Sequence, residues 1–267
     1  MKKVYLSADD FGRSRERNRA IDECFRRGWI KSAGLIVTSQ HLDDAVHLMV
    51  NGGYINHVHL HFNLSGNLDV SEANDRPVTM SMMQDKSFCY EDGRFHSYQG
   101  LPNRIADILL IFKTIRVYKE LCAQYQKFLS ITKGKGNRYH IDFHVWYNLT
   151  WSTAIALNLF TWSHKIKSVR YIGVHLLCSK RMRFFKLLSW NPFVKNYLTG
   201  NIDFFITKPE KFEKESVFEL YCHPDYIDGK IMDNSVSYLG HEKKLMETNF
   251  RLLKDNNEIE MKSWFDE

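Results

Sequence analysis

Two adjacent carboxylates stand where the first apolar run of the chain ends. Asp9 and Asp10 lie in SADDFG (7–12), and the chain then turns through Gly12 into a helix-like pattern. In parallel α/β folds, ligands bind at the carboxyl ends of the strands. One carboxylate could bind a metal ion while its neighbour acts as a base. The alternative interpretation is a turn with a helix-capping aspartate.

Three histidines alternate in HVHLHF (57–62). Period-2 spacing places His57, His59 and His61 on one face of a predicted strand. His61 is nearest the carboxyl end of that strand, where a ligand site is expected. We therefore interpret His61 as the functional histidine and His57 as structural, and the role of His59 stays open.

Two later motifs place further imidazoles at strand ends. In HIDFHVWYN (140–148), His140, Asp142, His144 and Trp146 share a face. Two histidines and an acid suit a divalent metal, although the acid could instead orient a histidine. In ELYCHPDY (219–226), the His-Pro turn directs His223 toward the same edge, where an imidazole can act as a general acid or base.

The elements that would position these groups alternate between short β-rich runs and longer helical ones. This alternation predicts a barrel-like α/β domain with about seven parallel strands, built as a single domain over 1–267. A long excursion is expected over 64–100. The predicted strands are 2–8, 32–39, 54–62, 137–145, 168–173, 202–207 and 216–222, and the predicted helices are 14–28, 41–51, 103–128, 151–163 and 236–254.

Composition narrows the functional classes. The 267 residues are 44% hydrophobic with a formal net charge of +6, which falls short of the charge typical of nucleic-acid binding. The five cysteines include no CxxC pair, which argues against a disulfide framework or a zinc ribbon. Neither a signal peptide nor a membrane-spanning run is recognisable, so a cytoplasmic location is expected.

Together, the four motifs resemble those of the YdjC-like carbohydrate deacetylases, the group that includes bacterial chitooligosaccharide deacetylases. Ala8–Gly12, His59–Ser65, His140–Asn148 and Glu219–Asp225 stand in the order of the family's motifs, and the resemblance extends over about residues 3–225. It implies a deformed (β/α) barrel, with about seven parallel strands in a single domain, related to the NodB-type polysaccharide deacetylases. It also implies one divalent metal ion, magnesium or zinc, and an N-acetylated sugar or oligosaccharide as substrate.

The resemblance also assigns roles to individual residues. Asp10, His61 and His144 become the metal ligands, Asp9 the catalytic base and His223 the catalytic acid. The expected substrate contacts are Arg170, Asp142, Trp146 and Asn63. In this reaction a metal-activated water attacks the amide carbonyl and releases acetate.

The chain departs from the family pattern at several positions. His59 stands where glycine is usual, and Asp225 replaces the glycine after His-Pro. In the fourth-strand motif the replaced positions are Phe143, Val145, Trp146 and Asn148. The departures keep two alternatives open, namely a catalytically degenerate carbohydrate-binding barrel and a metal-dependent phosphoester hydrolase.

One further segment is unusual. SKRMRFFKLLSWNPFVKNY (179–197) interleaves five cations with aromatic residues. We favour a solvated helix or arm that packs on the barrel. The alternative is a peripheral contact with a membrane surface or a lipid-linked glycan. A homodimer is compatible with these observations, and no nucleic-acid partner is expected.

Overall fold

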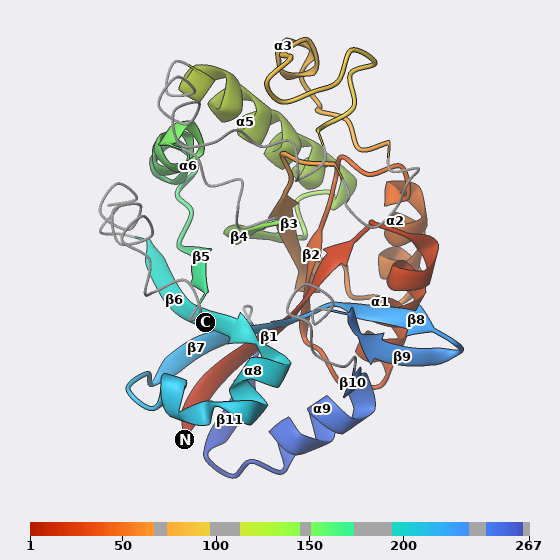
Figure 1. The fold of residues 1–267 in the computed structure, drawn as a ribbon, viewed down its shortest axis with the longest axis vertical. Coiled ribbons are helices and arrows are strands. Elements are labelled where there is room, and N and C mark those ends of the chain that lie inside the picture. Colours follow the sequence, from red (N-terminus) through yellow and green to blue (C-terminus); the bar gives the residue numbers. More distant parts are fainter. Residues whose placement is uncertain (67–73, 97–112, 145–150, 174–193, 235–243, 264–267) are drawn as a thin grey trace.

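The computed structural model describes residues 1–66, 74–96, 113–144, 151–173, 194–234 and 244–263. Seven parallel strands follow one another around a nearly closed barrel (Figure 1). This architecture confirms the predicted α/β barrel. The strands are β1 (Lys2–Phe11), β2 (Ser32–Leu35), β3 (Val58–Phe62), β4 (Asn137–Phe143), β5 (Ser168–Gly173), β6 (Lys195–Asn201) and β7 (Val217–Cys222).

The barrel closes at β1, which is the longest of these strands. On one edge, β1 pairs with β7 from Lys3↔Val217 to Ala8↔Cys222. The other edge is shared, because β2 pairs with β1 from Ser7 onward while β11 (Ile259–Lys262) pairs with Lys2 to Tyr5. A late strand therefore fills the part of the β1 edge that the short β2 leaves uncovered.

Side chains alternate between two sets along the barrel strands, except where the strand register shifts, as at the end of β1. One set is apolar and packs outward into the main hydrophobic core: Val4, Leu6, Ala8, Ala33, Leu35, Val58, Leu60, Phe62, Ile141, Val169, Phe218 and Leu220. The other set is polar and points inward: Ser7, His59, His61, His140, Asp142, Ser168, Arg170, Thr199 and Glu219, all buried. The hydrophobic core thus lies outside the barrel, while the barrel interior is polar.

Helices cover the outside of the barrel (Figure 1). Helices α1 and α2 contact one another, as do α5 and α6 on another side of the barrel. The longer helices are α1 (Arg15–Arg26), α2 (Leu42–Asn51), α5 (Thr114–Ile131), α6 (Trp151–His164) and α9 (Met246–Lys254), and the short ones are η1 (Ile55–His57), α3 (Met80–Met83), α8 (Ile202–Thr207) and η6 (Pro209–Phe212).

The prediction of a strand at 202–207 is wrong, because these residues form α8. The side chain of Asn201 caps this helix by accepting a hydrogen bond from Phe204 N at 3.0 Å, and Asp203 lies in its first turn. The sixth strand lies earlier, at Lys195–Asn201, and begins inside the segment predicted as an arm. The rest of that segment, up to residue 193, lies outside the described residues.

The excursion after β3 is folded where the structure describes it. Its residues 74–96 bury Met82, Phe88 and Phe95. Glu120 of α5 is fully buried and accepts hydrogen bonds from Val78 N and Thr79 N, each at 2.8 Å. This carboxylate fixes the excursion to α5, which in turn packs beside β3.

A small antiparallel sheet follows β7. It contains β8 (Pro224–Ile227), β9 (Lys230–Asp233) and β10 (Lys244–Leu245), and β8 packs on α1. Among the residues that the structure describes, no helix has both the length and the apolar character needed to cross a membrane.

Candidate functional site

A β-bulge at the end of β1 turns two consecutive carboxylates into the barrel mouth. Ala8 pairs with Ala33 and Phe11 with Leu35, so that Asp9 and Asp10 together face the single residue Gly34. Asp10 has a φ of 67°, in the left-handed region that few residues other than glycine, asparagine and aspartate adopt. In a regular strand the two side chains would point to opposite faces. Here the side chains of Asp9 and Asp10 are both buried, and each forms ion pairs with side chains inside the barrel mouth.

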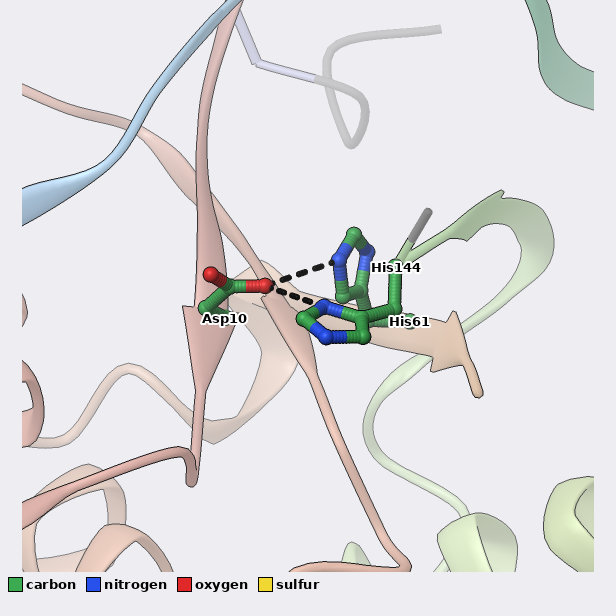
Figure 2. Close-up of side chains that lie close together, drawn as sticks. All are labelled: Asp10, His61 and His144. Atoms are coloured by element: carbon green, nitrogen blue, oxygen red, sulfur yellow. Dashed lines mark hydrogen bonds and ion pairs between the residues drawn. The ribbon is translucent and has the colours of Figure 1, made fainter. Parts of the chain in front are cut away.

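Asp10, His61 and His144 converge at this mouth from β1, from β3 and from the residue after β4 (Figure 2). His144 Nδ1 lies 2.6 Å from Asp10 Oδ1, and His61 Nε2 lies 3.3 Å from the same oxygen. Each residue thus offers one ligand atom to a common point. The structure therefore brings together the three residues predicted as metal ligands.

The donor set fits a divalent ion. His61 Nε2 is buried and, within the described part of the chain, lies 3.3 Å from Asp10 Oδ1, so once the ring is deprotonated its lone pair can face a metal ion. Two ligand atoms that share a tetrahedral zinc at about 2.0–2.1 Å lie about 3.3 Å apart. That is the separation of His61 Nε2 and Asp10 Oδ1.

Two arginines hold the second oxygen of Asp10. Arg13 Nη1 lies 2.7 Å from Oδ2, and Arg17 Nη1 also donates to it. Burial would raise the pKa of Asp10, but His144 and Arg13 hold it well below its usual range. Arg17 Nη2 continues to Asp225 Oδ2 at 2.9 Å. Asp225, which stands where the family pattern has glycine, is therefore connected through Arg17 to Asp10, a candidate metal ligand.

Asp142 of β4 lies beside His61, its register partner on β3, and is fully buried. Its Oδ1 is 2.6 Å from His61 Nδ1, while its Oδ2 is 2.9 Å from His59 Nε2 and 2.8 Å from Arg170 Nη2. Burial lowers the pKa of His61, but Asp142 and Asp10 more than offset it and raise the pKa in the metal-free cluster. A cation would have to displace that proton, because imidazole coordinates in its neutral form.

Arg170 crosses the barrel interior to reach Asp9. Its Nη1 lies 2.5 Å from Asp9 Oδ2, although β5 and β1 are not neighbours in the sheet. Its Nε donates to Glu219 Oε1 at 2.7 Å. Burial raises the pKa of Asp9 to about 6, with Arg170 opposing the rise. The other oxygen, Asp9 Oδ1, is buried and has no hydrogen-bond partner among the described residues.

His223 approaches both carboxylates from the turn after β7. Its Nε2 lies 3.9 Å from Asp9 Oδ2 and 4.0 Å from Asp10 Oδ2. Its backbone N donates to Asp233 Oδ1 at 3.0 Å, which fixes the His-Pro turn. Burial lowers the pKa of His223 to about 3, only partly opposed by Asp10. A neutral imidazole at this place can accept a proton before it donates one.

The predicted substrate contacts occupy different positions. Asn63 is buried, donates to Thr38 Oγ1 at 3.0 Å and to Asp75 Oδ2 at 3.1 Å, and accepts from Ser65 N. Asn63 therefore ties the end of β3 to the excursion. Asp142 and Arg170 lie deep in the barrel interior, whereas Trp146 lies outside the described residues. His57 is not on the β3 face as predicted, because the strand begins at Val58 and His57 belongs to η1.

Several residues at the site were missed in the sequence. Arg13 and Arg17 follow the ADDFG motif and flank the start of α1. A cation at the start of a helix is unfavourable, because it opposes the helix dipole. The position of these two arginines was therefore a signal that they pair with carboxylates elsewhere. Gly34 lies inside a strand, where glycine often marks a close approach. A Cβ on Gly34 would lie 2.9 Å from His61 Nδ1. Glu219 belongs to the motif that contains the His-Pro turn, but nothing in the sequence predicted a role for its side chain.

Comparisons with known proteins identify relatives of this chain. Two proteins named carbohydrate deacetylase, from Xenopus laevis and Danio rerio, are each 30% identical to this chain over 142 residues, 53% of its length. The match covers 42% and 41% of those proteins, about two fifths of their length. A crystal structure from Enterococcus faecalis V583, of a protein to which cellobiose-phosphate cleavage is provisionally ascribed, shares the fold with a TM-score of 0.64 at 17% identity, covering 99% of this chain and 98% of that one. The family model described as YdjC-like protein matches residues 3–260, and the chain belongs to the YdjC-like family.

Proposed function

We propose that this protein is a metal-dependent carbohydrate N-deacetylase that hydrolyses the N-acetyl group of a sugar or oligosaccharide. The observation that carries the proposal is the convergence of Asp10, His61 and His144 with Asp9 and His223 at one barrel mouth. The names of the frog and zebrafish relatives support the same substrate class.

Asp10, His61 and His144 would hold one divalent ion. Two imidazoles and one carboxylate favour zinc or another transition ion over magnesium, which prefers oxygen ligands. A bound ion would polarise the amide carbonyl and lower the pKa of water. Arg13 and Arg17 hold the second oxygen of Asp10, so Oδ1 is the oxygen left to face the ion.

The protons would move through Asp9 and His223. Arg170 holds Asp9 Oδ2, so the unpaired Oδ1 is the oxygen that accepts a proton from the attacking water. His223, neutral at the start, takes up the proton that Asp9 removed from the water and delivers it to the leaving nitrogen, with its Nε2 3.9 Å from Asp9 Oδ2. Water adds to the acetyl carbon and the C–N bond breaks, so the products are acetate and the free sugar amine.

The remaining predicted residues divide into two roles. We assign Asp142, Arg170 and Asn63 to positioning, because each is buried and already engaged by protein groups. Asp142 orients His61, and Arg170 orients Asp9. Trp146 stays a candidate for contact with the substrate.

The experiment is acetate release from a panel of N-acetylated sugars and oligosaccharides, with zinc or magnesium added to the chelator-treated protein. We expect acetate release that requires the ion and falls at least about 100-fold in Asp10→Ala and His144→Ala, since each removes a metal ligand. His57→Ala is the matched control, because His57 lies in η1 and its Nδ1 is 3.2 Å from Lys31 O.

Three results would contradict the proposed deacetylase function or its metal site. Acetate release that persists in Asp10→Ala removes the metal-site assignment. Phosphate release from phosphorylated sugars without acetate release would favour the phosphoester hydrolase. Sugar binding without any hydrolysis would favour the carbohydrate-binding barrel.

A further inference from the structure

A second group of metal-ligating side chains lies below the candidate metal site. His59, His140 and Asp142 are all buried and bring one nitrogen or oxygen each to a common point. This point already has a cation beside it, because Arg170 Nη2 lies 2.8 Å from Asp142 Oδ2 and 2.7 Å from Glu219 Oε1. The arginine supplies the positive charge that a second metal ion would bring, so the lower cluster has another role.

Asp142 links the lower cluster to the candidate metal site. Its Oδ2 accepts from His59 Nε2 at 2.9 Å and lies 2.8 Å from Arg170 Nη2, so this oxygen is fully used. Its Oδ1 is left for His61 Nδ1 at 2.6 Å. A hydrogen bond to one imidazole nitrogen fixes the tautomer and the ring orientation, and leaves the other nitrogen for a metal.

We infer that His59 is a positioning residue for the metal site and acts through Asp142 on His61. The inference rests on the metal site of the proposed function. His59 is fully buried and lies below the mouth, and its Nδ1 has no hydrogen-bond partner among the described residues, so Nε2 carries the proton given to Asp142. Glycine, which is usual here in the family pattern, could not donate this hydrogen bond.

His59 also fills space, because its ring packs edge-on against His140 with a centroid separation of 4.6 Å. A purely structural role would need only the volume of the side chain, whereas positioning needs the Nε2 donor. His59→Leu keeps much of the volume and removes the donor. His59→Gln replaces the ring by an amide that can donate from a similar place. The two variants therefore separate the two roles.

The test is metal affinity of the chelator-treated protein, measured for Zn²⁺ and Co²⁺ by competition with a chromogenic chelator. We expect about 10- to 100-fold weaker binding in His59→Leu and recovery to within about fivefold of wild type in His59→Gln, as for other groups that orient a metal-binding histidine. The Co²⁺ absorption spectrum should change in His59→Leu and return in His59→Gln. His57→Leu, two residues earlier, should bind as wild type does.

The outcomes are distinct. Undiminished affinity and an unchanged Co²⁺ spectrum in His59→Leu would overturn the inference alone. A wild-type protein that binds neither ion would overturn the proposed function and the inference with it. If His59→Leu does not fold, His59→Gly tests the same donor with the residue of the family pattern, and affinity equal to wild type there overturns the inference.

Discussion

Asp9 and Asp10 can act in one site because a single residue of β1 leaves the regular strand conformation. The left-handed φ of Asp10 costs about 1 kcal/mol for a residue with a Cβ. Ion pairs with Arg13 and Arg17 offset this cost. Opposite the bulge, Gly34 has no side chain, and His61 occupies that space. The geometry of the candidate metal site therefore depends on Gly34, a residue that has no functional group of its own.

Replacing Gly34 by alanine should displace His61. The new Cβ would lie 2.9 Å from His61 Nδ1, closer than real Cβ contacts come, and 3.0 Å from its Cβ, which is tighter than most real Cβ contacts. His61 must then move relative to Asp142 and Asp10, so we expect metal affinity to fall at least about 10-fold. Overpacking should also lower the free energy of unfolding by about 1–3 kcal/mol.

Gly200→Ala is the matched control for overpacking. Gly200 lies in β6, and its Cβ would meet the Phe212 ring at 2.7 Å, on the apolar side of the barrel wall. This variant should lose stability to a similar extent but keep wild-type metal affinity. Chelator competition and urea unfolding measure the two quantities. Equal metal affinity in Gly34→Ala and wild type would show that Gly34 does not control His61.

At the scale of elements, hydrophobic alternation predicted most of the barrel. Six of the seven strand positions were located because each carries apolar residues on one face and polar residues on the other. The pattern failed at 202–207, where aromatic and β-branched residues are typical of a strand but Asn201 caps a helix. Local capping outweighed β propensity there.

The excursion shows what periodicity could not predict. Its attachment depends on long-range pairs, such as Glu120 of α5 with Val78 N, which leave no periodic pattern in the sequence. A second attachment joins Asp85 to Lys113 at 2.6 Å and to Arg116, near the start of α5. These two carboxylates hold residues 74–96 against the helix.

The Asp85 attachment gives a pH-dependent prediction. Burial would raise the pKa of Asp85, but hydrogen bonds from Lys113 and Ser87 and the neighbouring Arg116 lower it to about 2, from 3.8. Because the folded pKa is depressed, this pairing stabilises the protein above about pH 4, and the contribution is lost as the pH falls toward 2. The two cations are partly exposed, so we expect only about 1 kcal/mol.

Urea unfolding of Asp85→Asn from pH 7 to pH 3 checks this. The variant should be less stable than wild type at pH 7, and the difference should shrink as the pH is lowered. Asp92→Asn is the control, because Asp92 forms an exposed pair with Arg94 and should leave stability unchanged. A difference between Asp85→Asn and wild type that is constant over this range would contradict the assigned pKa.

At the scale of the whole molecule, the barrel is organised around a charged interior. Three of its members, Asp9, Asp142 and Arg170, were predicted as site residues, whereas Glu219 was not. The sequence could not show their pairing, because Arg170 reaches Asp9 and Glu219 across the barrel rather than along neighbouring strands. Three buried carboxylates thus share one guanidinium.

This sharing makes Arg170 both a positioning residue and a structural one. Arg170→Leu would leave Asp9, Asp142 and Glu219 buried without their common cation, and breaking a buried ion pair in this way costs about 3–5 kcal/mol. In the double variant Arg170→Leu/Glu219→Leu, one uncompensated carboxylate is gone, so the loss of stability should be smaller than the sum of the losses in the two single variants.

The control is Arg138→Leu, at an exposed position of β4, which should change stability by less than about 0.5 kcal/mol. Urea unfolding at pH 7 is measured for wild type, Arg170→Leu, Glu219→Leu, the double variant and Arg138→Leu. Strict additivity, or a loss in Arg170→Leu as small as in Arg138→Leu, would mean that the barrel interior does not depend on this shared charge.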